Sequence, residues 1–397
     1  MFHGVRIVEL AQYVFVPGAS VMMADQGAEV IKIEPPGVGD PYRTLKIGDG
    51  REIEGVNLAM EQNNRNKKSL ALDLKSEEGR EALMRLIETA DVFLTSLRPK
   101  AIRALKLDVA DLRARNPKII YARGNGFGFK GKEADKPGFD ASAFWARGGM
   151  CYALTRPGQQ PTSPRPSLGD HTSSLALAYG IASALFKRAT TGEPSVVETS
   201  LLATAVWVLS ADVTYSQRPG YALHGVQATR PPLKYAYTTK DGRIIQLMLL
   251  DPRPYWAPLC RLLGLEALAQ DPRFLDNEAR MRHADELIGI IQKVIGSKDW
   301  EEWRPLFDAW DAPWELIRTI EDVSNDPQVH ANGMFIPMTL GDQKIRVVAS
   351  PAAFDGQTAL ESAVPSPRLG EQTDALLTGL GYSPTEITDL RGRRVIQ

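Results

Sequence analysis

The sequence contains few of the residues that cross-link small proteins or bind transition metals. Its two cysteines, Cys151 and Cys260, are too few for a disulfide framework and too isolated for a zinc cluster. The five histidines are scattered and form no HExxH pair. We therefore expect neither a disulfide scaffold nor a bound metal, and we interpret both cysteines as buried apolar residues.

The sequence also lacks a large net charge and long apolar runs. The 47 basic and 48 acidic residues leave a formal charge of -1, which does not predict nucleic-acid binding. The longest apolar run, Leu201–Leu209, is far shorter than the 18 or so residues of a membrane span. The N-terminus leads directly into the strand-like run Val5–Leu10, without the pattern of a signal peptide. These absences predict a cytoplasmic protein whose anionic ligands meet local basic residues.

The first 125 residues alternate short β-type runs with helical patterns. This alternation predicts βαβ units and a Rossmann-like, doubly wound parallel sheet in a large α/β domain. Proline-rich breaks around Arg218–Pro232 predict a linker, and the turn Asp241-Gly242 between apolar runs predicts a β-hairpin in a smaller α+β domain. The expected segments are a large domain over residues 1–217, a small domain over 218–325, and a C-terminal part over 326–397 that returns to the first domain.

The sequence also predicts two elements in the C-terminal segment and one long buried helix. Ile345–Val348 is a predicted strand and Gln372–Leu380 a predicted helix of the returning segment. Thr172–Arg188 is apolar almost all round, which predicts a helix buried inside a large protein.

One glycine motif after the predicted strand Ile119–Ala122 resembles a nucleotide-binding signature. Gly126, Gly128 and Gly131 match the spacing of the dinucleotide fingerprint, but the residues that follow have no helical apolar face. The same stretch nearly matches a phosphate-binding loop, except that Glu133 stands where a hydroxyl should reach magnesium. There is also no Gly-x-Ser-x-Gly elbow. We therefore expect neither a nucleotide site nor a serine hydrolase.

Asp170 lies between a glycine-rich stretch and the long apolar helix. An aspartate here is a good helix N-cap, which is a purely structural role. The helix dipole and free amides would also hold its pKa low, so that it stays ionised as a nucleophile, with Gly169 leaving its flank open. Asp140 is a second candidate, as the cap of a short apolar helix over Ala141–Ala146 or as a site residue.

The sequence resembles class III CoA-transferases, a family that includes formyl-CoA, carnitine and bile-acid CoA transferases and related α-methylacyl-CoA racemases. The resemblance extends over nearly the whole chain, in the segments Gly4–Leu10, Gln26–Glu34, Gly37–Asp40, Asn66–Lys75, Pro137–Asp140, Leu168–Asp170 and Leu369–Asp374.

The resemblance implies that Asp170 is the catalytic nucleophile. It would attack an acyl-CoA donor to form an acyl-aspartyl anhydride, which CoA converts to an aspartyl-CoA thioester, before a carboxylic acid acceptor takes the CoA. The resemblance also implies an interlocked homodimer. CoA is then a substrate, and no permanently bound cofactor is expected.

The family pattern also implies where CoA binds. The matching positions are Gln12, Tyr13, Val14, Leu72, Lys75, Ser96, Leu97, Arg103, Lys136, Phe139 and Asp140. The sequence departs from some relatives at Pro35 and Pro36, which replace basic residues, and at Ser96-Leu97, which replace an Asn-Phe pair. Arg98, Arg103, Lys75 and Lys136 are the candidates to supply charge to the CoA phosphates. Phe139, Phe144 and Trp145 would form an apolar acyl pocket or belong to the core.

Two alternatives remain open. The related racemases carry a histidine directly before the acid that matches Asp140, where this sequence has Phe139, which cannot transfer a proton. His171 lies close enough in sequence to keep a racemase or epimerase under consideration. A CoA-binding protein without catalysis is the third hypothesis, and the presence of Asp170 argues against it.

Overall fold

The computed structural model describes residues 1–45, 56–156, 158–220, 231–356 and 360–397. The chain forms two compact units. Unit 1 comprises Met1–Leu223 and Gln328–Gln397, and unit 2 comprises His224–Pro327. The predicted linker Arg218–Pro232 lies mostly in residues 221–230, outside the described residues.

Unit 1 is built on a sheet of six parallel strands in the order β3-β2-β1-β4-β5-β6. The strands are β1 (Arg6–Leu10), β2 (Glu29–Glu34), β3 (Lys68–Ala71), β4 (Val92–Thr95), β5 (Ile120–Asn125) and β6 (Val196–Ser200). Central strand β1 pairs on both sides, so that Ile7 lies opposite Val30 of β2 and Val92 of β4. This is the doubly wound α/β sheet that the alternating sequence pattern predicts.

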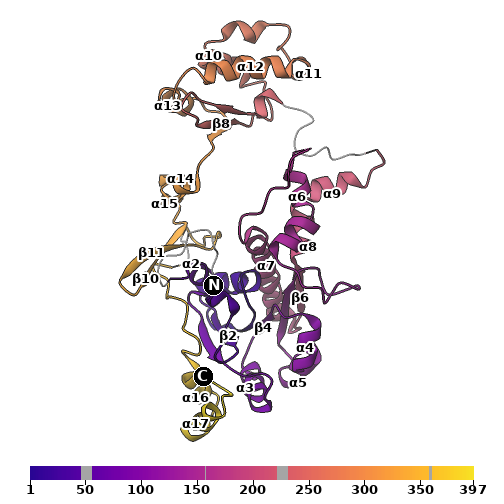
Figure 1. Cartoon of the computed structure of the whole chain (residues 1–397), viewed down its shortest axis with the longest axis vertical. Coiled ribbons are helices and arrows are strands. Elements are labelled where there is room, and N and C mark those ends of the chain that lie inside the picture. Colours follow the sequence, from indigo (N-terminus) through magenta and orange to yellow (C-terminus); the bar gives the residue numbers. More distant parts are fainter. Residues whose placement is uncertain (46–55, 157, 221–230, 357–359) are drawn as a thin grey trace. The chain divides into compact units, whose positions relative to one another are not determined.

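Helices cover both faces of this sheet (Figure 1). The helices of unit 1 are α1 (Phe15–Asp25), η1 (Pro41–Arg43), α2 (Leu58–Asn64), α3 (Glu77–Glu88), α4 (Pro99–Leu105), α5 (Val109–Arg115), η2 (Asp140–Arg147), α6 (Met150–Leu154), α7 (Leu168–Thr191), α8 (Leu201–Val208), α9 (Ser210–Ser216), α15 (Pro327–Ala331), α16 (Thr373–Gly379) and α17 (Pro384–Gly392). Because neighbouring strand residues face opposite sides, Val8 packs with α3, α5, α16 and α17, whereas Ile7 packs with α1, η2, α7 and α8.

The C-terminal segment packs against the first part of unit 1. It begins with a hairpin of β10 (Phe335–Leu340) and β11 (Gln343–Val348), so the predicted strand and the predicted helix, here α16, are both present. Near the end of the chain, Ile396 pairs with Leu72, and the Asp73 amide donates to the Val395 carbonyl at 2.8 Å. These backbone bonds fix the C-terminus beside β3.

The prediction that the long helix is buried all round is wrong. One side of α7 packs on α1 and the sheet, but Leu175, Tyr179 and Phe186 on α7 are 46%, 76% and 71% exposed. The apolar residues of α7 lie on every side of the helix, and the described elements that pack on α7 cover only part of this surface.

Unit 2 has a three-stranded antiparallel sheet in the order β7-β8-β9, and the predicted hairpin at Asp241-Gly242 joins its first two strands. Its strands and helices are η3 (Pro232–Lys234), β7 (Ala236–Thr238), β8 (Ile244–Leu247), α10 (Trp256–Leu262), η4 (Glu266–Gln270), α11 (Asn277–Arg282), α12 (Ala284–Ile295), α13 (Trp300–Asp308), β9 (Trp314–Leu316) and α14 (Ile320–Ser324). Its separate core centres on Trp303 and Phe307. Among the helices that the structure describes in either unit, none has the length and apolar character to cross a bilayer.

Candidate active site

A small cleft lies at the carboxyl ends of β1, β2 and β4. Its walls are formed by Leu10, Ala11, Gln12, Ile33, Glu34, Pro35, Asp40 and Leu97. The Gln12 amide donates to the Ser96 hydroxyl at 3.0 Å, which joins the loop after β1 to the loop after β4. The sheet order reverses between these two strands, and open α/β sheets bind their ligands at such a point. The structure thus brings the predicted residues Gln12, Ser96 and Leu97 together.

Other predicted CoA-binding residues lie differently. Leu72 is 1% exposed, packs in the core and pairs through its backbone with Ile396, so it has no free side chain to offer a ligand. Lys75 is exposed at the start of α3. Val14 is buried against Tyr42 and Met60.

The predicted basic residues after β4 and β5 meet around one acidic loop. Arg103 lies 3.3 Å from the Asp135 carboxylate, and Arg98 donates to the Asp135 carbonyl at 3.0 Å. Lys136 pairs with Glu133 at 3.1 Å. All three basic side chains remain exposed, so an incoming phosphate could replace these weak surface partners.

Asp170 lies in the first turn of α7 and is not its N-cap. The helix begins at Leu168, and the N-cap is Ser167, with a left-handed φ of 64°. The expectation that Gly169 leaves an open flank is also wrong. A Cβ atom at Gly169 would lie 2.3 Å from Cγ of Phe144 and 2.5 Å from Oδ1 of Asp140, so glycine is needed for this close approach.

The Asp140 carboxylate occupies the flank of Gly169. Both of its oxygens lie 3.1 Å from the Gly169 amide nitrogen, which donates to them. Asp140 is the first residue of η2, a π-helical turn of a kind that is frequent at functional sites. Burial raises the pKa of Asp140, and the amides of Gly169 and Asp170 oppose that rise. Asp140 thereby takes the helix amides that Asp170 was expected to use.

The Asp170 carboxyl has a raised pKa, contrary to the low value expected from its position. Burial, and then the negative charge of Asp140, raise the pKa of Asp170 to about 7. Within the described part of the chain its carboxylate has no hydrogen-bonding or ion-pairing partner. The Asp170 carboxyl therefore binds a proton more tightly than an ordinary aspartate does.

Aromatic side chains border this site unequally. Phe139 is 58% exposed, and its ring meets the Tyr13 ring edge to face with centroids 5.4 Å apart. Phe144 and Trp145 are only 1% and 7% exposed, so of the three proposed pocket residues only Phe139 presents its ring to solvent.

His171 is engaged with α2. Its Nε2 atom lies 3.1 Å from Oδ1 of Asn63, whose Nδ2 donates to the Ala59 carbonyl. Because Asn63 uses its donor there, the histidine Nε2 must carry the proton in this contact. Burial and the nearby Arg65 guanidinium lower the pKa of His171, which favours the neutral ring.

The glycine motif after β5 forms loops. Residues 126–139 contain no helix, and the next helical turn begins at Asp140. A Cβ atom on Gly126 would lie 2.8 Å from the Gly138 Cα atom, so this glycine permits the loop to fold back on itself. The dinucleotide fingerprint therefore lacks its helix here, as the sequence indicated.

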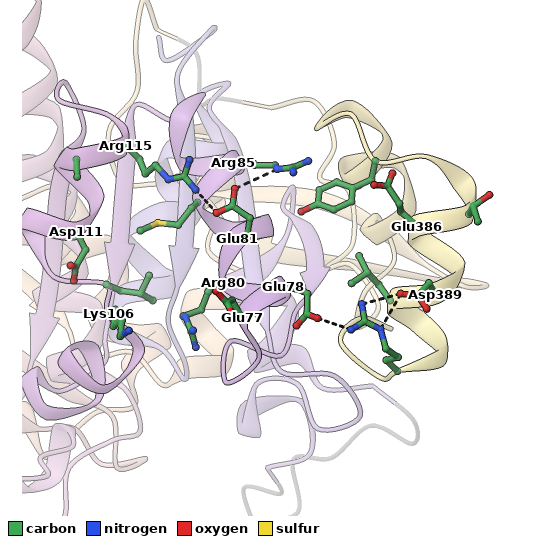
Figure 2. Close-up of a pocket in the computed structure, with 17 residues that line it drawn as sticks. Glu77, Glu78, Arg80, Glu81, Arg85, Lys106, Asp111, Arg115, Glu386 and Asp389 are labelled. Carbon is green, nitrogen blue, oxygen red and sulfur yellow. Dashed lines mark hydrogen bonds and ion pairs between the residues drawn. The ribbon is translucent and has the colours of Figure 1, made fainter.

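A separate cleft of about 880 Å³ lies between α3, α5 and α17 (Figure 2). Its charges are largely paired with one another: Arg393 binds Glu78 at 2.6 Å and Asp389 at 2.9 Å, and Arg115 binds Glu81. None of the predicted CoA-binding residues lines it, nor does Asp170.

The residues that the sequence reasoning missed are buried and charged. Glu9, Lys32, Asp40 and Lys67 lie beneath the loop Gln12–Val14 with 0–4% exposure. The signal was present in β2, where charged residues alternate with apolar ones in a strand that is buried on both faces.

The chain thus combines a doubly wound α/β sheet, a small cleft at the switch point of that sheet, and a half-buried carboxylate, Asp170, at the start of α7. The protein-family model for CoA-transferase family III matches residues 2–373 of the chain. The chain therefore belongs to this family, as the resemblance predicted, and is an enzyme of the CoA-transferase class.

Named relatives support this assignment over the full length. The chain is 31% identical to the (R)-2-hydroxy-4-methylpentanoate CoA-transferase of Clostridioides difficile, with 100% of both chains covered. It is 34% identical to the cinnamoyl-CoA:phenyllactate CoA-transferase of Clostridium sporogenes, with 98% of this chain and 96% of the relative covered. A solved Mycobacterium tuberculosis structure, 30% identical, superposes with a TM-score of 0.82 over 94% of this chain and 98% of the other.

Proposed function

We propose that this enzyme transfers CoA from an acyl-CoA donor to a carboxylic acid acceptor through covalent intermediates on Asp170. The observation that carries the proposal is the Asp170 carboxylate itself, which is half-buried at the start of α7 and unpaired within the described residues. A desolvated carboxylate is a stronger nucleophile than a hydrated one, because it need not shed water or an ion partner to attack.

The first half of the reaction moves CoA onto the enzyme. Asp170 attacks the donor thioester carbonyl, the C–S bond breaks, and CoA leaves as a thiolate while an acyl-aspartyl anhydride forms. The thiolate then attacks the aspartyl carbonyl of the anhydride. This releases the donor acid as a carboxylate and leaves an aspartyl-CoA thioester.

The second half repeats these steps with the acceptor. Its carboxylate attacks the aspartyl thioester, which releases the CoA thiolate and forms a second anhydride. Attack of the thiolate on the acceptor carbonyl then gives the new acyl-CoA and regenerates the Asp170 carboxylate. No proton, ATP or permanently bound cofactor is consumed, because each step exchanges one acyl bond for another.

The same proposal places CoA at the carboxyl ends of the strands. Gln12 and Leu97 line the cleft, and Ser96 accepts a hydrogen bond from the Gln12 amide. The exposed Arg98, Arg103 and Lys136 can donate to phosphate oxygens, which favour such donors. The cytoplasmic location expected from the N-terminal sequence stays a prediction.

Covalent trapping tests the proposed mechanism. The enzyme is incubated with acyl-CoA donors, including those of 2-hydroxy acids with apolar side chains and of dicarboxylic acids, and quenched with hydroxylamine or borohydride. We expect mass spectrometry to find the modification on Asp170, since the aspartyl thioester reacts with either reagent. CoA transfer without an adduct on Asp170 would rule out this mechanism. Exchange of the α-proton in deuterated water without CoA movement would indicate a racemase, and CoA binding without either would indicate a non-catalytic protein.

We also infer a homodimer. Large apolar side chains are exposed on α6, α7 and α8, where no described element of the same chain covers them. They are Tyr152, Leu154, Leu175, Tyr179, Phe186, Val206, Trp207 and Val208. An apolar surface on this scale is typical of a protein interface, and a second copy is the occupant that the resemblance implies. The interlocked arrangement stays a prediction.

Introducing negative charges on this apolar surface should dissociate the dimer into monomers. Light scattering of the purified wild type is expected to give twice the chain mass of 43.7 kDa. Replacing Tyr179 and Trp207 together with glutamate should give monomers, because each buried carboxylate would cost several kcal/mol at an apolar interface. Glu301→Lys on α13, a helix with a charged outer side, is the control and should leave the mass unchanged. A monomeric wild type would refute the inferred dimer.

A further inference from the structure

A cluster of four buried charges lies under the loop Gln12–Val14. Glu9 binds Lys32 through one carboxylate oxygen at 2.9 Å and Lys67 through the other at 2.9 Å. Lys32 also binds Oδ2 of Asp40 at 2.9 Å, and all four side chains are 0% exposed. The proposed reaction uses none of these groups.

Opposite charges in this cluster shift the pKa values of Glu9 and Lys32 toward their ionised forms. Burial alone would raise the pKa of Glu9, but Lys32 and Lys67 outweigh it and hold that pKa at about 2. Burial would lower the pKa of Lys32, yet Glu9 and Asp40 raise it above its ordinary value. Burial lowers the pKa of Lys67 to about 8. Buried ion pairs are poor sources of stability, so a cluster this costly invites a search for a role in geometry.

The cluster holds both sides of the loop. Lys32 donates to the Ala11 carbonyl at 2.9 Å, directly before the loop. Asp40 accepts through Oδ1 from the Tyr13 amide at 3.2 Å and from the Tyr42 amide at 2.9 Å. Tyr13 has a φ of 65°, a left-handed conformation that costs a non-glycine residue about 1–2 kcal/mol. Asp40 thus helps to retain a strained residue, and such strain tends to occur at functional sites.

Both tyrosines extend from Asp40 toward the nucleophile. The Tyr13 ring packs edge to face on Phe139, whose neighbour Asp140 binds the Gly169 amide. The Tyr42 side chain, 4% exposed, packs on Tyr13 with centroids 6.3 Å apart. Burial raises the pKa of Tyr42, and Ser167, the N-cap of α7, and Asp170 also act on it, so the Tyr42 hydroxyl lies near the start of α7. Asp40 is therefore linked to the turn that carries Asp170 by two routes, one through Tyr13 and Phe139 and the other through Tyr42.

We propose that Asp40, held by Lys32, is a positioning residue for CoA transfer. It fixes the backbone of Tyr13 and Tyr42, and through them both the CoA-facing loop Gln12–Val14 and the start of α7. This inference rests on the proposed function, because it assigns Asp40 to the placement of Asp170 relative to bound CoA.

Near-isosteric substitutions test this role. Asp40→Asn keeps the shape but sets a neutral amide against the Lys32 ammonium. We expect it to raise both the KM for acyl-CoA and the Kd for CoA, measured by calorimetry, about tenfold, and to lower kcat about tenfold, because displacements of an ångström are costly in catalysis. Lys32→Met should behave alike. Tyr42→Phe keeps the ring and removes only the hydroxyl near the start of α7, so kcat should fall several-fold with KM and Kd unchanged.

The matched control is another buried ion pair in unit 1. Asp25 binds Arg65 at 2.6 Å with side chains 0–1% exposed, and it contacts neither the loop Gln12–Val14 nor Tyr42. Asp25→Asn should lower the Tm while kcat, KM and Kd stay at wild-type values.

The outcomes are distinguishable. The inference is overturned if Asp40→Asn lowers the Tm as much as Asp25→Asn does but keeps the kcat, KM and Kd of the wild type. Asp40 would then have only a structural role. If Asp40→Asn fails to fold, an unaltered kcat in Tyr42→Phe overturns it. If the wild type binds CoA but transfers none, the proposed function fails, and the Kd of Asp40→Asn still decides whether Asp40 positions the loop.

Discussion

Asp170→Asn is expected to lower CoA transfer at least about a thousandfold, the scale on which nucleophile removal acts in other enzymes, while raising the stability of the protein at pH 8. Transfer fails because an amide cannot form the anhydride or the thioester. Stability rises because the native state holds this carboxyl with a pKa of about 7, against an ordinary value of 3.8.

The sign of the stability effect follows from which state binds the proton more tightly. The folded protein favours protonated Asp170, so the cost of ionising it in the fold is absent below pH 3.8, grows from there to pH 7, and is complete above. Each unit of pKa shift corresponds to about 1.4 kcal/mol, and partial exposure reduces the sum, so we expect a gain of about 2–4 kcal/mol at pH 8. Below pH 4 the variant and the wild type should be equally stable.

Denaturant unfolding at pH 8 and pH 4, beside transfer assays, measures both effects. Asp91→Asn is the control, because Asp91 binds Arg188 near the other end of α7, about 27 Å along the helix from Asp170. It should lose stability and keep activity, the reverse of Asp170→Asn. Transfer activity within tenfold of wild type in Asp170→Asn would contradict the nucleophile assignment.

The sheet could be predicted because short β-type runs alternate with helical patterns along the first 125 residues. The surroundings of α7 could not. Its apolar residues predict burial in general, whereas the described elements of the chain leave Leu175, Tyr179 and Phe186 exposed. Periodicity describes a helix and carries no information about which molecule packs against it.

At the site, the sequence located Asp170 and misjudged its ionisation. A helix start normally stabilises a carboxylate, but here Asp140, thirty positions earlier, takes the Gly169 amide and adds a like charge. Only the three-dimensional arrangement decides which carboxylate receives the amides. Similarly, Lys32 and Asp40 look like ordinary charged residues until the fold buries them together.

The coupling between Asp140 and Asp170 predicts a specific pH dependence. Because attack requires ionised Asp170, the single-turnover rate of adduct formation should rise about tenfold per pH unit below pH 7 and level off above it. Asp140→Asn removes the like charge and retains an oxygen that can accept from the Gly169 amide. The pKa of Asp170 should therefore fall, and the acid limb should move down by about one pH unit, with burial keeping it above 3.8.

The midpoint of the pH dependence below pH 7 distinguishes an electrostatic role of Asp140 from a purely structural one. Asp140→Ala removes the acceptor as well as the charge, so it should shift the limb in the same direction and also lower the plateau, because the start of α7 loses its cap. If Asp140→Asn lowers the rate equally at every pH and leaves the midpoint at 7, the negative charge of Asp140 does not set the ionisation of Asp170. If the rate instead falls above pH 7 in the wild type, a protonated group is required, and attack by ionised Asp170 is not what limits adduct formation.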